Sequence, residues 1–260
     1  MRQEDREKAG GVTTTLTGLR KVLAAAGLES LWQIPGWQPA ESIRLLPLGA
    51  RTAPARGASK FGGDPDLPSG AVWPLIGKRA LSFLAQIHLP DLKPFAAASG
   101  LPKRGQLWFF ADTLDIPRKG GSACRVIYST AATATLRSAS PPVDASSTPL
   151  SDIFPVRAMR FQSILSVPER IPESLDPELR EALMALINPE GIVHKIFGYP
   201  NRIQNPLTGK AGSETLLLQL DSDRRLDMQW GDAGRLFLMS SGRDPGGTEF
   251  NNCSVAIQSY

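Results

Sequence analysis

Four short segments in the second half of the chain repeat segments of the first half, in the same order. Residues 60–65 match 195–200 at an offset of 135 (195 − 60), with Lys, Gly and Pro in common. The other matches pair 83–87 with 216–220, 105–109 with 234–238, and 124–126 with 253–255, where the offset is 129 (253 − 124). This order predicts two related units, each a Gly- and Pro-containing loop followed by about three strands. Each unit alone has too little core, so we expect them to pack as halves of one domain. The alternative is that strand-rich segments match through shared composition.

The remaining pattern predicts helices at the flanks of these strands. Leucines at spacings of three and four predict a helix over 15–31, with Gly27 as a terminator. Asp176 followed by Pro177 predicts the N-terminus of a second helix, with an apolar stripe that includes Leu183 and Ile187. Short apolar runs predict strands at 81–85, 106–110, 125–128, 215–220, 235–239 and 254–258.

These elements suggest one domain behind a short tail. We expect a flexible tail over 1–12 and a single domain over 13–260. Within the domain, the first half covers about 40–130, a connecting loop and helix covers 131–191, and the second half covers about 192–260.

Composition narrows the location and the class of partner. The charged start of the chain is not a secretory signal, and no apolar run is long enough to span a membrane. The net charge of +4 is too small and too dispersed to favour a nucleic-acid partner. Cys124 and Cys253 are too few for a disulfide scaffold, so we expect them to be small core residues in a reducing cytosol. The chain is therefore expected to be cytoplasmic.

Several motifs resemble those of the YwqG-like family, a group known as a domain of unknown function, DUF1963. They are the segments 59–68, 73–74, 84–87, 101–110, 194–204, 217–223 and 230–234, and they extend the likeness over about 40–258. The resemblance implies an α+β fold with a mixed, mainly antiparallel β-sheet and flanking helices. It implies no reaction. Some relatives resemble immunity or accessory proteins that accompany secreted bacterial toxins, which gives a context and not a mechanism.

No arrangement of residues points to catalysis or to a resident metal. Residues 120–124 approach a nucleophile elbow, but Cys124 stands where that turn needs glycine. The histidines and cysteines lack the spacing of a zinc site, and Arg225 and Leu226 interrupt an EF-hand pattern. We therefore predict no catalytic residue, no metal and no cofactor. A divalent-cation site of another kind at the aspartates remains open.

Polar and aromatic residues gather in two loop regions and form the candidate ligand-binding set. The set comprises Lys60, Gly62, Gly63, His194, Tyr199, Gln204, Asp221, Asp223, Trp230 and Asp232. In a fold of two halves, equivalent loops meet at the seam, where clefts commonly form. The alternatives are that the glycines satisfy a tight turn and that the aspartates accept backbone hydrogen bonds. The repeated glutamines, Gln86 and Gln219, lie in apolar strands, so their amides must find backbone partners.

Two functions follow as hypotheses. The favoured one is a non-catalytic binding protein, in its most specific form an immunity protein that neutralises a bacterial toxin. The alternative is a small-molecule or metal-binding protein, or an enzyme, that uses a cleft near His194 and Asp232. The oligomeric state is left open.

Overall fold

The computed structural model describes residues 14–50, 54–114, 124–143, 151–168, 175–187, 191–204, 214–241 and 253–260. Its helices are α2 (Leu16–Ala25) and α3 (Pro177–Ile187), with 3-10 turns η1 (Glu29–Gln33), η2 (Leu89–Leu92), η3 (Ala96–Ala98), η4 (Thr133–Thr135) and η5 (Arg224–Leu226). Its strands are β1 (Ala40–Pro47), β2 (Lys60–Phe61), β3 (Asp66–Pro68), β4 (Leu75–Ile76), β5 (Arg79–Ala80), β6 (Ser82–His88), β7 (Gln106–Ala111), β8 (Cys124–Ser129), β9 (Leu136–Ser138), β10 (Arg157–Ser166), β11 (Lys195–Ile196), β12 (Glu214–Asp221), β13 (Arg235–Ser241) and β14 (Cys253–Gln258). The predicted tail over 1–12 lies outside the described residues.

Ten strands form one antiparallel sheet that curls into a nearly closed barrel. Their order is β14-β13-β12-β11-β1-β10-β2-β6-β7-β8. Strands β1 and β10 lie at the centre and pair over eight residues, from Ala40 opposite Ser166 to Pro47 opposite Met159. The two end strands, β8 and β14, contact each other, so the sheet nearly closes on itself. The expected mainly antiparallel sheet is confirmed.

The two end strands are also joined covalently. Cys124 begins β8 and Cys253 begins β14, and the two form a disulfide with their Cα atoms 6.1 Å apart. Both side chains are buried in the main core, as expected. The disulfide was not expected from the number of cysteines; it forms because curling of the sheet brings together two residues separated by 129 positions.

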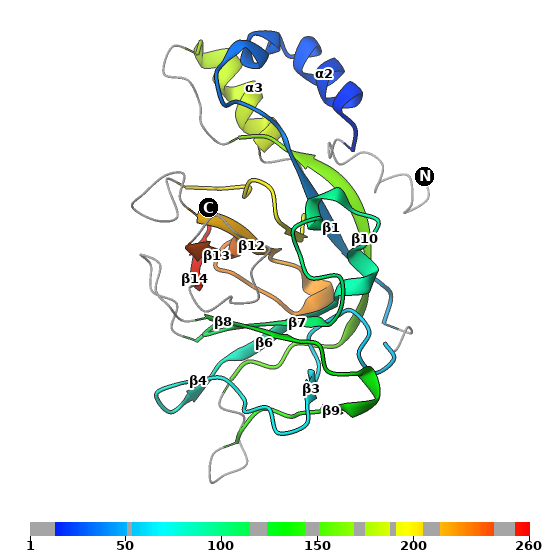
Figure 1. Ribbon diagram of the computed structural model, residues 1–260. Coiled ribbons are helices and arrows are strands. Elements are labelled where there is room, and N and C mark those ends of the chain that lie inside the picture. The colour runs from blue at the N-terminus through cyan, green and yellow to red at the C-terminus, as the bar shows by residue number, and fades with distance from the viewer. Residues whose placement is uncertain are drawn as a thin grey trace.

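The two helices pack together at one end of the molecule, beyond the ends of β1 and β10 (Figure 1). Thr15 caps α2 by accepting a hydrogen bond from the Gly18 amide at 3.0 Å. The helix ends earlier than predicted because Gly27 takes φ = +68°. Asp176 accepts from the Glu178 amide at 2.9 Å, which confirms the predicted start of α3. Their apolar faces share a second core, built from Leu19, Leu23, Leu28, Leu31, Trp37, Val167, Leu183 and Ile187.

The segment 131–191 holds more than the expected connecting loop and helix. It contributes β9 and the ten-residue strand β10, which pairs with both β1 and β2. Arg157 and Arg160 belong to this strand. Because of these charged residues, the sequence pattern did not predict a central strand here. Within the described residues, no helix is both long and apolar enough to cross a membrane.

Candidate functional site

The sheet contains two polar clusters, each built around a buried glutamine. Gln86 of β6 is the centre of the first cluster, and Gln219 of β12 is the centre of the second. The Gln86 amide nitrogen donates to the Ala58 carbonyl at 2.9 Å and to Asp66 Oδ2 at 3.1 Å. Its oxygen accepts from the Asp66 amide at 2.8 Å and from Trp108 Nε1 at 2.9 Å. Gln86 is fully buried, and the expectation that its amide finds backbone partners is confirmed.

Gln219 makes a corresponding set of bonds on the other side of the sheet. Its amide nitrogen donates to the Val193 carbonyl at 3.0 Å and to Asp221 Oδ1 at 2.9 Å. Its oxygen accepts from the Asn201 amide at 2.9 Å. Lys195 lies opposite Gln219 in the strand register, as Lys60 lies opposite Gln86.

The ammonium of Lys60 is held inside the first cluster. Lys60 Nζ donates to Asp66 Oδ2 at 2.9 Å, and the Gly57 amide donates to the same oxygen at 2.9 Å. Burial raises the pKa of Asp66, but the hydrogen bonds from Lys60, Gly57 and Gln86 outweigh it and leave the pKa below its ordinary value. Asp66 is thus an ionised structural acceptor.

His194, Asp221 and Asp223 come together in the second cluster, as a connected hydrogen-bond chain. His194 Nδ1 accepts from the Asp221 amide at 3.2 Å, so Nε2 carries the proton that points to Asp223 Oδ2 at 3.0 Å. The Arg225 guanidinium and amide also donate to Asp223. Burial raises the pKa of Asp223, but the bonds from His194 and Arg225 lower it far more.

This His–Asp pair has no access to solvent. The side chains of His194 and Asp223 are 1% and 2% exposed. The ring of His194 packs against Phe61 with ring centroids 5.4 Å apart. A general base must reach its substrate within hydrogen-bond distance, and here every ring nitrogen is already used by the fold.

A corresponding arrangement, with Ser59 in the place of His194, occurs in the first part of the sheet. Ser59 Oγ accepts from the His88 amide at 2.9 Å and donates to Asp91 Oδ2 at 2.8 Å. Ser59 precedes Lys60 as His194 precedes Lys195. The Ser59 hydroxyl and the His194 imidazole thus each connect a backbone amide to an aspartate. This role is structural and requires no reaction of either group.

The candidate glycines lie at a close approach of the backbone. Gly62 and Gly63 have φ of +52° and +66°, and a Cβ on Gly62 would lie 2.6 Å from the Pro155 carbonyl oxygen. Phe197 and Gly198, after β11, have φ of +61° and +68°. Both short strands therefore end in two consecutive left-handed residues, and the Gly62 and Gly63 amides donate to the Leu84 and Phe154 carbonyls.

The other candidates lie apart from this buried chain. Trp230 is 3% exposed and packs edge-on against Phe154, with ring centroids 5.9 Å apart. Tyr199 donates its hydroxyl to the Gln38 carbonyl at 3.0 Å, and burial raises the pKa of this phenol. Gln204 and Asp232 are exposed near the C-terminus: Gln204 Nε2 donates to the Ser259 carbonyl, and the Asp232 carbonyl accepts from the Tyr260 amide. The candidate set is thus split between core and surface.

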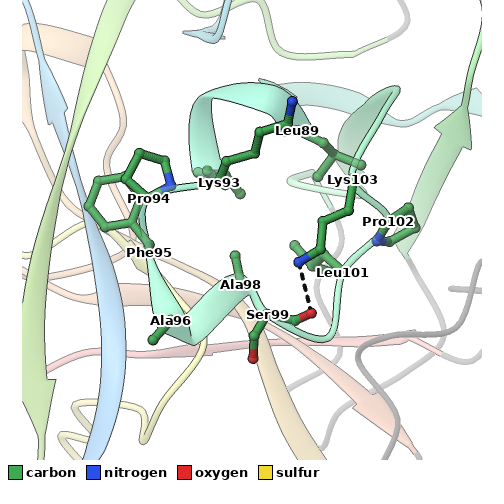
Figure 2. Close-up of a pocket in the computed structure, with 11 residues that line it drawn as sticks. Leu89, Lys93, Pro94, Phe95, Ala96, Ala98, Ser99, Leu101, Pro102 and Lys103 are labelled. Atoms are coloured by element: carbon green, nitrogen blue, oxygen red, sulfur yellow. Dashed lines mark hydrogen bonds between the residues drawn. The ribbon is translucent and has the colours of Figure 1, made fainter.

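A pocket of about 220 Å³ lies elsewhere, within the segment 89–103 (Figure 2). Sequence reasoning did not single out this segment. One sequence feature does mark this segment. The number of residues between repeated positions falls from 133, for Gln86 and Gln219, to 129, for Gly105 and Gly234. The first part of the chain therefore holds four extra residues between these two positions, and the pocket lies there.

A family model described as Domain of unknown function (DUF1963) matches residues 59–258. The chain belongs to this family. The match includes β2 to β14 and both buried glutamines, but it leaves out α2 and β1. No curated protein matches the chain.

Proposed function

We propose that this DUF1963 protein is a non-catalytic binding protein. The observation that carries the proposal is the state of the His194–Asp223 pair. Its two side chains are almost fully buried, and their polar atoms bond to one another, to a strand amide and to Arg225. A group that is buried and saturated in this way supports the fold and has no free atom for a substrate.

The two glutamine clusters belong to a pseudo-repeat of two halves in an α+β fold. The proposal is supported by agreement in bonding: Ala58 accepts from Gln86 and Val193 accepts from Gln219, over similar spacings of 28 and 26 residues. It is supported further by equal register shifts, between Phe83 and Ala85 in β6 and between Leu216 and Leu218 in β12. In this view the two halves form a rigid frame, and recognition falls to the surface.

The most specific form of the proposal is an immunity protein that binds and neutralises a bacterial toxin. It is supported by the family context. It is also supported by the fact that an inhibitor of this kind needs no catalytic residue. Exposed apolar side chains on the hairpin around β4 offer a contact surface: Val72 is 81% exposed and Leu75 is 51% exposed. A contiguous exposed apolar patch often marks a protein contact, and Val72 and Leu75 are three positions apart in this segment. The location proposed for this function is the cytoplasm of a bacterial cell.

The test is affinity purification of the tagged chain from its native cells, with mass spectrometry of the eluate. We expect one stoichiometric protein that is toxic when expressed alone and harmless when co-expressed with this chain. Leu75→Asp should weaken that complex. Leu16→Asp is the matched control, because Leu16 is 55% exposed on α2, at the opposite end of the molecule (Figure 1).

The alternative proposal is a ligand or metal site, or an active site, near His194 and Asp232. It requires the core to open, since His194 is buried whereas Asp232 is exposed. Among the residues that the structure describes, no three His, Cys, Asp or Glu side chains are grouped as a metal site requires. A purified monomer that carries only a small molecule or an ion would favour this alternative over toxin binding.

A further inference from the structure

The pocket in the segment 89–103 has an apolar floor. Leu89, Leu92, Ala98 and Leu101 line it and are themselves 1% to 6% exposed. Ala98 and Leu101 lie beneath the space enclosed by η2 and η3 (Figure 2). An apolar guest placed there would be shielded from water on the side of the floor, while the mouth of the pocket stays open to solvent.

Two ammonium groups flank this floor. Lys93 and Lys103 are both exposed, and Figure 2 shows them on opposite sides of the loop. Lys103 Nζ donates to the Ser99 carbonyl at 3.1 Å. No acidic residue lines the pocket, and within the described ranges neither lysine has a carboxylate partner.

The one carboxylate of this loop is already engaged. Asp91 Oδ2 accepts from Ser59 at 2.8 Å, and Asp91 Oδ1 lies 3.0 Å from His88 Nδ1. Arg104 follows Lys103 in the sequence and adds a further positive charge to this part of the chain. The field at the pocket mouth therefore favours an anion.

The loop is held in shape before any ligand arrives. Phe95 packs against Phe161 of β10 with ring centroids 6.2 Å apart. Backbone bonds from Phe95 to Leu92 (3.0 Å) and from Leu101 to Ala98 (3.0 Å) close its two turns. Preformed pockets lose less conformational entropy on binding than loops that must order first.

From these observations we propose that the pocket binds a small organic carboxylate with an apolar body. Its volume of about 220 Å³ leaves room for a phenyl ring with a short chain, and its open side leaves the carboxylate at the rim. The ring lies on the floor formed by Ala98 and Leu101, the carboxylate accepts a charge-assisted hydrogen bond from Lys103, and Lys93 adds positive charge at the rim. This site is separate from the His194 cluster and does not depend on a protein partner.

The test is a titration of the ¹⁵N-labelled full chain with 3-phenylpropionate, followed by amide chemical shifts. We expect saturable shifts centred on residues 89–103, with a dissociation constant on the order of 1 mM for a ligand of this size. 3-Phenylpropionamide, the neutral analogue, should bind at least about tenfold more weakly, because it lacks the charge.

Two variants separate the pocket from general attraction to a basic surface. Lys93→Met combined with Lys103→Met should weaken binding about tenfold or more while leaving the rest of the spectrum unchanged. Lys78→Met removes an exposed lysine on the β4–β5 hairpin and should leave binding unchanged. Shifts that do not saturate, that spread over the surface, or that are equal for the amide would overturn the proposal.

Discussion

Removal of the Cys124–Cys253 disulfide is the perturbation with the largest calculable effect on this fold. The bond joins the first residues of β8 and β14, the two ends of the ten-stranded sheet. It closes a loop that spans 129 positions of sequence. In the chain-entropy model, a cross-link over such a loop disfavours the unfolded state by about 5 kcal/mol at 25 °C. This value is near the upper end for disulfides because the loop is so long.

The assay is equilibrium unfolding in urea, followed by tryptophan fluorescence. We compare the oxidised protein, the reduced protein and the double variant Cys124→Ala/Cys253→Ala. For a slope of about 3 kcal/mol/M, a loss of about 5 kcal/mol lowers the urea midpoint by roughly 1.5–2 M. The reduced protein and the double variant should unfold at similar midpoints, and reductant should not affect the double variant.

Two results would refute this reasoning. One is a double variant as stable as the oxidised protein. The other is detection of two free thiols in protein that was purified and denatured under oxidising conditions. The same thiol assay on protein taken directly from cells tests the proposed cytoplasmic location, since disulfides are rare in a reducing cytosol.

Three further predictions concern the turns and the buried clusters. Gly62→Ala should lower the unfolding free energy by about 2–4 kcal/mol in thermal melts, because Gly62 has a positive φ and a Cβ would contact Pro155. The control Gly49→Ala, which has open space around it, should change the unfolding free energy by less than about 0.5 kcal/mol. Gln219→Leu should cost about 2–5 kcal/mol in urea unfolding, because it removes the buried partners of Val193 and Asn201. The pKa of Asp223 is lower in the folded state than in the unfolded state, so the stability that its ionised form contributes is complete above the unfolded pKa near 4 and is lost as pH falls below about 4. In Asp223→Asn, stability followed by circular dichroism should therefore depend less on pH in this range.

The helices and six of the fourteen strands in the described residues were predictable, because local signals were strong there. Asp176 and Pro177 mark the start of α3, and Gly27 marks the end of α2. Apolar runs located β6, β7, β12 and β13 to within a few residues. The strand β10 was not predicted, because exposed and buried positions do not alternate regularly along it and its basic residues resemble a solvated face.

Long-range pairing could not be predicted from spacing alone. The disulfide depends on the closure of the sheet, which no local pattern encodes for Cys124 and Cys253. The repeated glutamines were informative, since a buried amide in an apolar strand requires partners, and Gln86 and Gln219 have them.

The candidate site was predicted only in part. His194, Asp221 and Asp223 do come together, because β11 and β12 are adjacent in the sheet. Sequence could not indicate that they are buried. Nor could it indicate the pocket near Lys93 and Lys103, which depends on how a proline-containing loop folds back on itself.

We propose that this chain works by binding a protein and performs no chemistry of its own. The most direct test is native mass spectrometry of the tagged chain isolated from its own cells. We expect a complex of fixed stoichiometry with one protein, and Leu75→Asp should lower its abundance more than Leu16→Asp does. A monomer with no protein partner, together with turnover of a substrate that His194→Ala abolishes without loss of folding, would contradict it.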